Sequence, residues 1–199
     1  LDITNPKVHK FNSEGSFLVQ WGDNPKINGR LHRPNGVVVD PNGNIFVVDT
    51  HNHRIQKFNK AGDFLISWGS LGTEDGKFNS PCGIAIDKNG DVYISDAIGR
   101  IQKFNSSGSF LKKWGGYGTA NGQLNSPTGL TIDADGNILV VDSGNNRIQK
   151  FSTSGAFLSK WGINGQGNGQ FNRPSGIAIS RIGDIYVADF YNLRIQKFN

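Results

Sequence analysis

Three of the four histidines in the chain lie near one another in sequence, and two arginines accompany them. Neutral imidazole rings are common zinc ligands, and imidazole rings beside guanidinium groups also suit an acidic ligand. The group therefore has two interpretations, a metal site and a binding surface. Its members are Arg30, His32, Arg33, His51 and His53.

A second group places a guanidinium beside aromatic rings, and it consists of Arg173, Phe190 and Tyr191. Arginine and large aromatic side chains are enriched among the residues that dominate binding at protein interfaces. This group therefore indicates a second binding surface. Ordinary variation between loops is the alternative.

Other motifs that could do chemistry are incomplete. Cys82 has no recognisable histidine partner, and as the single cysteine it cannot form an internal disulfide. The segment from Asp133 begins like a calcium-binding loop, but Gly136 stands in the fourth place instead of the sixth and no glutamate occupies the twelfth. We expect no catalytic residue, no bound metal and no cofactor.

An aspartate followed by an arginine four or five residues later recurs four times. A catalytic acid would not need four copies, whereas a structural ion pair recurs with the fold. A carboxylate can accept two hydrogen bonds from one guanidinium, and we expect each pair to form a structural clasp. The pairs are Asp49 with Arg54, Asp96 with Arg100, Asp142 with Arg147, and Asp189 with Arg194.

The basic residues follow the same pattern. A net charge of +5 permits an anionic partner such as RNA, so the location of the charge matters. Five lysines recur once per repeat, and we expect them to form a solvated stripe, which leaves no dense basic cluster. They are Lys10, Lys57, Lys103, Lys150 and Lys197.

The elements that position these residues repeat every 46 or 47 residues. Each repeat contains four short segments with the composition of strands, separated by turn residues. Such short links predict an antiparallel meander. In the first complete repeat the segments begin at Gly36, Asn44, Arg54 and Asp63, and the Trp-Gly pair that closes each repeat begins at Trp21, Trp68, Trp114 and Trp161.

The second segment of each repeat is apolar on both faces, as in Ile45-Phe46-Val47-Val48. Both faces of such a strand must be covered. Four-stranded sheets stacked face to face around an axis provide this cover, because each sheet packs on two neighbours. The pattern therefore predicts an all-β propeller, and a two-sheet sandwich would not explain the period.

The repeated residues resemble the NHL repeat. PSGIAIS from Pro174 is similar to the P-x-G-[IV]-A-[IV]-D opening of that family, and VVDSGNNRIQKF from Val140 is similar to its [VI]-x-D-x-x-N-x-R-[IV]-Q-x-F centre. The resemblance covers essentially the whole chain. It implies a β-propeller, usually of six blades, and no single activity.

We predict one NHL β-propeller domain over residues 1–199, with about four repeats that form four-stranded antiparallel blades. Closing four blades would leave one third strand too many, so we expect part of a six-bladed ring or a ring completed by oligomerisation. The predicted blades span residues 23–69, 70–115 and 116–162, with partial blades at 1–22 and 163–199.

The leading functional prediction is a non-enzymatic scaffold whose loop-bearing rim binds a protein, a peptide or another polymer. The resemblance offers two alternatives. One is single-stranded RNA binding, carried by Arg30, Arg33, Arg173, Tyr191 and the histidines. The other is a metal-dependent lyase or lactonase, although such a site would draw histidines from several blades. No apolar run predicts a membrane span, and the compartment is not indicated.

Overall fold

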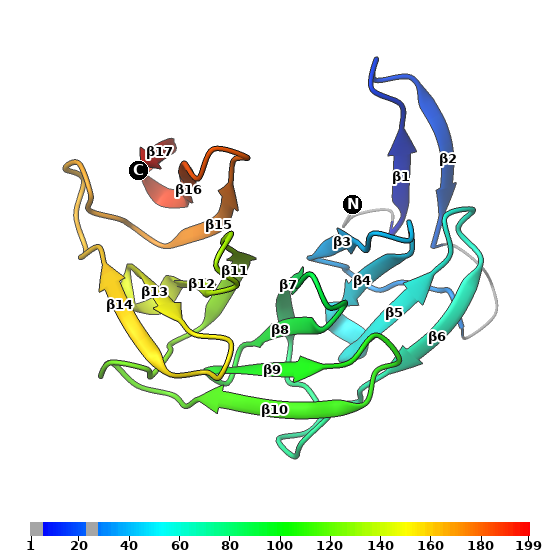
Figure 1. The fold of residues 1–199 in the computed structure, drawn as a ribbon, viewed down its shortest axis with the longest axis horizontal. Coiled ribbons are helices and arrows are strands. Elements are labelled where there is room, and N and C mark those ends of the chain that lie inside the picture. Colours follow the sequence, from blue (N-terminus) through cyan, green and yellow to red (C-terminus); the bar gives the residue numbers. More distant parts are fainter. Residues whose placement is uncertain (1–5, 23–27) are drawn as a thin grey trace.

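The computed structural model describes residues 6–22 and 28–199. Its strands form consecutive antiparallel sheets, and the sheets follow one another along an open arc (Figure 1). This arrangement confirms the predicted all-β propeller with antiparallel blades. No helix among the described residues is long and apolar enough to cross a membrane.

Three sheets are complete blades in which four strands lie side by side in chain order. Short 3-10 helices join the second and third strands of the first and third of these blades, η1 (Thr50–Asn52) and η2 (Ser143–Asn145). The blades consist of β3 (Val37–Val39), β4 (Ile45–Asp49), β5 (Arg54–Phe58) and β6 (Phe64–Trp68); β7 (Pro81–Ile86), β8 (Val92–Asp96), β9 (Arg100–Phe104) and β10 (Phe110–Gly115); and β11 (Pro127–Ile132), β12 (Ile138–Asp142), β13 (Arg147–Phe151) and β14 (Phe157–Trp161).

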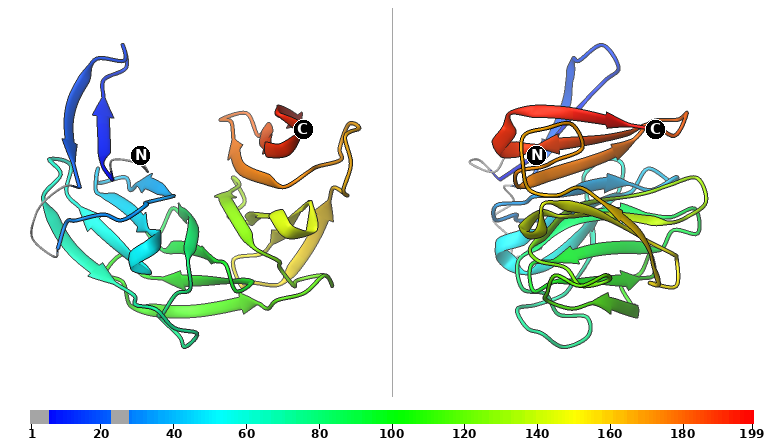
Figure 2. Two further views of the ribbon diagram at one scale, coloured as in Figure 1. Left: turned by 180° about the vertical axis from the view of Figure 1, so that it is seen from behind. Right: turned by 90° about the vertical axis from the view of Figure 1, so that its left-hand side faces the viewer.

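Two further sheets lie at the ends of the arc, and each has fewer strands. One is the hairpin of β1 (Val8–Phe11) and β2 (Phe17–Trp21), and the other contains β15 (Pro174–Ile179), β16 (Ile185–Asp189) and β17 (Arg194–Phe198). The helix η3 (Phe190–Asn192) joins β16 to β17. The two end sheets stand apart across the opening of the arc (Figures 1 and 2).

The core lies between neighbouring blades. Each residue of β4, β8 and β12 is buried, which agrees with strands that are apolar on both faces. Val48 and Ile55 of one blade pack against Phe78 and Phe104 of the next. Apolar surface removed from water at these junctions is what holds consecutive blades together.

The turn between the first and second strands is closed by an aspartate. Asp40 Oδ1 accepts hydrogen bonds from the backbone N–H groups of Asn42 and Asn44, at 2.9 and 2.8 Å. Gly43 has a φ of +82°, in the left-handed region that glycine adopts at no steric cost. The predicted tight turn therefore contains both the aspartate that accepts the backbone hydrogen bonds and the glycine that adopts the left-handed conformation.

The innermost strands approach one another through a glycine at the same place in each blade. A methyl group added to Gly36 would lie 2.7 Å from the carbonyl oxygen of Cys82, and one added to Gly83 would overlap the carbonyl oxygen of Thr128. Ser95 Oγ strengthens the second junction, because it accepts from the Gly83 N–H at 2.7 Å and donates to the Thr128 oxygen at 2.6 Å.

We expect Gly83→Ala to lower the free energy of unfolding by about 1–3 kcal/mol, because the new methyl group forces two strands apart. Urea unfolding measures the change. Gly176→Ala is the matched control, because it occupies the same place in the β15–β17 sheet and its nearest obstacle is Ala188 Cβ at 3.7 Å. Equal losses in the two variants would contradict the proposed role of glycine at the blade junction.

Candidate functional site

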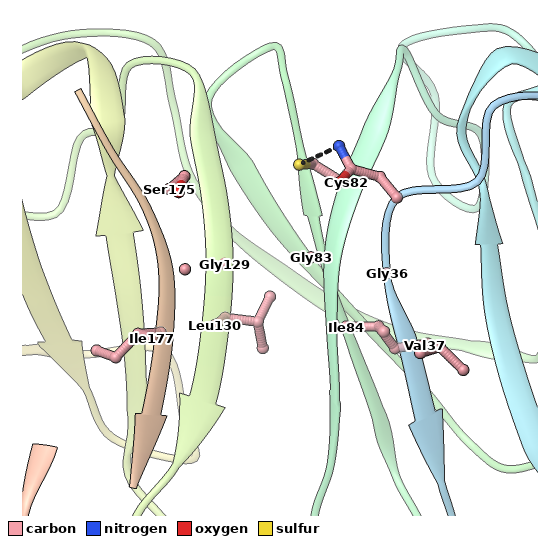
Figure 3. A pocket seen from close by; sticks show the side chains of 11 residues that line it. Gly36, Val37, Cys82, Gly83, Ile84, Gly129, Leu130, Ser175 and Ile177 are labelled. Atoms are coloured by element: carbon pink, nitrogen blue, oxygen red, sulfur yellow. Dashed lines mark hydrogen bonds between the residues drawn. The ribbon is translucent and has the colours of Figure 1, made fainter. Parts of the chain in front are cut away.

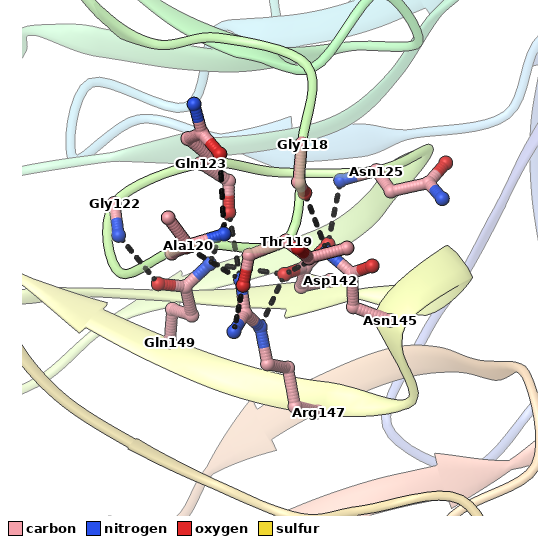
Figure 4. A network of polar contacts seen from close by, with 10 residues as sticks. All are labelled: Gly118, Thr119, Ala120, Gly122, Gln123, Asn125, Asp142, Asn145, Arg147 and Gln149. Carbon is pink, nitrogen blue, oxygen red and sulfur yellow. Dashed lines mark hydrogen bonds and ion pairs between the residues drawn. The ribbon is translucent and has the colours of Figure 1, made fainter.

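A buried carboxylate organises one rim of each blade, and Figure 4 shows it for the β11–β14 blade. In the β11–β14 blade, Asp142 lies at the end of β12 and is fully buried. Its Oδ1 accepts from the backbone N–H of Asn125 at 2.7 Å, and its Oδ2 accepts from Asn145 Nδ2 at 2.9 Å. The carboxylate thus ties the loop before β11 to the helix η2.

The arginine of the pair contacts this carboxylate through one nitrogen only. Arg147 Nε donates to Asp142 Oδ2 at 2.6 Å. The other two nitrogens donate to the loop before β11, Nη1 to the Thr119 oxygen at 2.8 Å and Nη2 to the oxygens of Ala120 and Gln123 at 2.9 Å. The pair is thus present, but Arg147 does not form the two-bond contact, because backbone carbonyls take the remaining guanidinium donors.

A glutamine that the sequence interpretation did not single out completes the network. Gln149 Nε2 donates to Asp142 Oδ2 at 2.9 Å and to the Gln123 oxygen at 2.6 Å, and its Oε1 accepts from the Gly122 N–H at 2.9 Å. The side chain is fully buried. The signal was present in the sequence, since a buried amide at the centre of each RIQKF strand needs polar partners.

The other blades repeat this network with one exception. Asp49 and Asp189 accept from Arg54 Nε and Arg194 Nε at 2.8 Å, and both also accept from an asparagine of the adjoining 3-10 helix. Asp96 pairs with Arg100 at 3.0 Å, but the one-residue deletion before Arg100 removes that asparagine.

The pKa values of Asp96 and Asp189 are shifted in opposite directions. Burial raises the pKa of Asp96 more than the Asn79 backbone N–H and Arg100 lower it. Burial also acts to raise the pKa of Asp189, but hydrogen bonds from Asn172, Asn192 and Arg194 together lower it. Burial therefore outweighs the donors at Asp96, inside the arc, and the donors outweigh burial at Asp189, in the three-stranded end sheet.

The histidines of the first complete blade lie on the rim that these networks shape. The rings of His32 and His51 are exposed, with centroids 5.0 Å apart. Partial desolvation, followed by the charges of Arg33, His32 and His53, lowers the pKa of His51. The neutral form of the His51 imidazole is therefore favoured, and Arg33 supplies positive charge beside it.

The His53 side chain and the Arg30 carbonyl group form hydrogen bonds within the fold. His53 Nδ1 accepts the backbone N–H of Ser80 at 3.0 Å, a contact that Asn146 Oδ1 repeats with the Arg173 N–H at 2.8 Å. His53 therefore links one blade to the next. The carbonyl oxygen of Arg30 accepts from Gln56 Nε2 at 2.7 Å, while the Arg30 side chain is exposed.

The second predicted group lies on the β15–β17 sheet, at the same rim. Phe190 and Tyr191 begin η3, are 59% and 62% exposed, and have ring centroids 5.3 Å apart. Arg173 is exposed in the loop before β15, and the Tyr191 N–H donates to the oxygen of its neighbour Asn172 at 3.1 Å. Leu193 beside them is also exposed.

The two groups lie on the β3–β6 blade and on the β15–β17 sheet, with two blades between them, so the structure does not bring them together (Figure 1). Between them, the loops that enter the intervening blades and the β15–β17 sheet present apolar side chains that the sequence interpretation missed. These loops join the same rim, since Asn145 and Asn192 of the 3-10 helices donate to loop carbonyls at 2.9 and 2.8 Å. The exposed side chains are Leu71, Tyr117 and Ile163.

The recurring lysines do not form the expected solvated stripe. Lys103 is largely buried and pairs with Asp91 at 2.7 Å, and Lys150 and Lys197 pair with Asp133 and Asp184 at the same distance. At least nine of the 21 lysines and arginines stand in ion pairs. Ion pairs therefore offset the charge of these nine basic residues.

The axial side of the arc has a cavity of about 420 Å³, lined by the glycines of the inner strands and by Cys82, Asn35 and Ser175 (Figure 3). Burial raises the pKa of the Cys82 thiol to about 11, and Asn35 Nδ2 donates to its sulfur at 3.1 Å. The thiol is therefore protonated at neutral pH and a poor nucleophile. Among residues 6–22 and 28–199, no three His, Cys, Asp or Glu side chains are grouped to hold a metal ion.

Comparison with known proteins supports the repeat assignment. The family model described as NHL repeat matches residues 31–58, 124–151 and 171–198. Each match runs from the loop before the first strand to the end of the third strand, and so contains the buried aspartate, arginine and glutamine. No curated protein sequence matches the chain.

Several solved structures share the fold at low sequence identity. A streptogramin B lyase has a TM-score of 0.72 at 16% identity, covering 99% of this chain and 63% of that one. The virginiamycin B lyase of Staphylococcus aureus gives 0.69 at 18%, covering 98% and 64%. A protein of unknown function from Bacteroides caccae gives 0.65 at 15%, covering 94% and 65%. The chain thus spans less than two thirds of the length of these structures.

We expect Asp142→Ala to lower the free energy of unfolding by about 3–5 kcal/mol, because it leaves the Arg147 charge and the Gln149 amide buried without their acceptor. Asp135→Ala is the control, since Asp135 is exposed in the turn at the opposite end of β12. Its loss should be within about 0.5 kcal/mol in the same urea titration. Similar losses for both variants would contradict a structural role for the buried carboxylate.

Proposed function

We propose, from the premise that this chain is a β-propeller of NHL repeats, that it is a binding module whose rim recognises a protein or peptide. The rim consists of the loops that lead into each blade and the links between second and third strands. The observation that carries the proposal is a series of large apolar side chains that are exposed on loops. The backbones of these loops are held by hydrogen bonds to the buried network of aspartate, arginine and glutamine.

The backbone of these loops is held by the buried network. In the loop before β11, Thr119, Ala120 and Gln123 each offer a carbonyl to Arg147, and Gly122 donates to Gln149. A loop fixed in this way loses little conformational freedom when a ligand binds. Preorganised loops on a rigid scaffold are common carriers of recognition.

The side chains on the rim have the composition of a protein interface. Tyr117 is 71% exposed, and Tyr191, Phe190, Leu71 and Ile163 are between 59% and 64% exposed. Aromatic and arginine side chains are enriched at interface centres, and exposed apolar groups that gather on one surface often mark a partner site. Arg33 and Arg173 add positive charge near the two ends of this surface, which favours a partner with acidic groups beside apolar ones.

Single-stranded RNA is less well supported as the ligand. RNA binding of this kind needs a continuous basic groove as well as aromatic platforms. The recurring arginines of this chain are tied to aspartates, and Lys103, Lys150 and Lys197 are paired with turn aspartates. The exposed arginines that the structure describes on the rim, Arg30, Arg33 and Arg173, lie in two separate groups, which is not the continuous basic groove that such binding needs.

The likeness to two lyases concerns the fold alone, because identity is 16–18%. A propeller can carry unrelated functions, so activity has to be argued from the site. The histidines His32 and His51 lie on one blade and beside the charge of Arg33, which disfavours a cation at that place.

We expect Tyr191→Ala to raise the Kd for a captured partner by about 30-fold, which corresponds to the loss of a residue that dominates an interface. The partner is captured by the immobilised chain, purified, and titrated against each variant by calorimetry. Ile182→Ala is the control, because Ile182 is 85% exposed in the turn at the opposite end of the same sheet. A partner that loses affinity for the Ile182 variant alone would place the site on the other rim.

We also expect no retention of a mixed-sequence single-stranded RNA in a filter-binding assay at about 50 mM salt, the condition that favours phosphate contacts. Retention that falls steeply between about 50 and 200 mM salt, and that also falls with Tyr191→Ala, would identify RNA instead of a protein as the ligand of the rim. Retention unaffected by Tyr191→Ala would place RNA on a surface other than the rim.

A further inference from the structure

A histidine links two complete blades, β3–β6 and β7–β10. His53 follows η1 in the left-handed conformation, with a φ of +52°, and its Nδ1 accepts the backbone N–H of Ser80 at 3.0 Å. We propose that His53 is a pH-sensitive link: its neutral ring ties the loop before β7 to the preceding blade, and its protonation in mildly acidic solution releases that loop. This device requires no ligand, so it goes beyond the proposed function and does not depend on it.

The other repeats show which residues occupy the same place without a titratable group. His53 corresponds to Gly99 and Asn146, and all three residues have a positive φ. Asn146 Oδ1 accepts the backbone N–H of Arg173 at 2.8 Å, whereas Gly99 has no side chain that could accept. An amide oxygen accepts a hydrogen bond at any pH, and an imidazole nitrogen does not. The chain therefore contains a titratable link and its non-titratable counterpart.

Protonation removes the bond because it removes the acceptor. The Ser80 N–H can act only as a donor, so Nδ1 of His53 must carry a lone pair. In the imidazolium both ring nitrogens carry hydrogens, and two donors then face each other. Both residues are half-buried, so water replaces the lost acceptor only in part. Imidazole ordinarily changes its charge between about pH 5 and 8, so the bond is present above this range and is lost as the pH falls through it.

The bond holds a residue in an unusual backbone conformation. Ser80 has a φ of +54°, in the left-handed region that non-glycine residues rarely adopt. Its neighbour Asn79 is held from within its own blade, because the Asn79 N–H donates to Asp96 Oδ1 at 3.0 Å, and β7 begins at Pro81. His53 is thus the contact that ties this point of the loop to the preceding blade. Protonation of His53 therefore frees the loop at Ser80.

The apolar contacts beneath the same junction do not titrate. Phe78, two residues before Ser80, is fully buried and packs with Val48 and Ile55 of the preceding blade. Loss of the His53 bond therefore loosens the loop without separating the blades. We expect a local opening at low pH and no unfolding of the blade.

Charged groups on both sides of the junction bear on this change. The charge of His53 acts on His51 together with the charges of Arg33 and His32. An imidazolium at His53 would therefore join a group that is already basic. The acidic residues on the adjoining segments have cationic partners of their own, namely Arg54 for Asp49, Lys77 for Glu74, Lys113 for Asp75 and Arg100 for Asp96. Acidification thus adds repulsion within the histidine group to the loss of the Ser80 bond.

Hydrogen exchange of backbone amides, followed by NMR, tests the link in the unmodified chain. The protection factor corrects for the intrinsic effect of pH on exchange. We expect that of the Ser80 N–H to fall about tenfold between about pH 7.5 and pH 5.5, as the bond is lost. The Arg173 N–H is the internal control, since the Asn146 amide accepts it at both pH values, and its protection should not change. An equal fall at both amides would indicate a general loss of stability and would overturn the proposal.

Two reciprocal variants separate His53 from the other histidines. His53→Asn keeps an acceptor and leaves His32 and His51 in place, so the protection of the Ser80 N–H should become independent of pH. Asn146→His should give the Arg173 N–H the pH dependence that the Ser80 N–H has in the unmodified chain. A Ser80 amide whose protection is constant in the unmodified chain, or still depends on pH in the His53→Asn variant, would contradict the role of His53.

Discussion

The carboxylate at the end of each second strand is fully buried, and burying a charge costs several kcal/mol unless donors surround it. In the β11–β14 blade the donors come from Asn125, Asn145, Arg147 and Gln149. They lie on three separate segments, so the carboxylate is satisfied only when the loop, the 3-10 helix and the third strand are all in place. The aspartate thereby makes the rim of each blade a cooperative unit.

This network also explains why the rim can vary in sequence. Asp142 and Arg147 contact the loop through its backbone N–H and carbonyl groups, so the loop side chains are free to differ. His32 illustrates the point, because its backbone N–H donates to Asp49 Oδ1 at 2.6 Å just as Asn125 does to Asp142. Its imidazole remains exposed. One fixed backbone can therefore present histidine in one blade and asparagine in the others at the same place.

The sequence predicts the blades well because one physical requirement produces each of them, namely that strands that are apolar on both faces must be buried on both faces. The period, the turns and the Asp–Arg pairing all follow from residues that recur. Three features do not follow, because they depend on distances between segments. The guanidinium of Arg147 prefers loop carbonyls to a second carboxylate contact, Lys103 pairs with Asp91 instead of facing solvent, and His53 bridges to Ser80. The curvature of the arc, and with it the distance between Arg33 and Tyr191, is also set by packing between the inner strands and not by any local sequence pattern.

Stability in a repeat protein is carried by contacts between neighbours, so an outermost repeat lacks one of its two interfaces. Repeat proteins commonly solve this with polar residues on the outer face of the last repeat. The β15–β17 sheet carries no such replacement at Ile195, which has the same identity as Ile55, Ile101 and Ile148 in the internal blades. An isoleucine left in water forgoes the stabilisation of about 1.5–3 kcal/mol that a buried one contributes. The β15–β17 sheet therefore keeps, at this position, the side chain of an internal blade junction and not that of a cap.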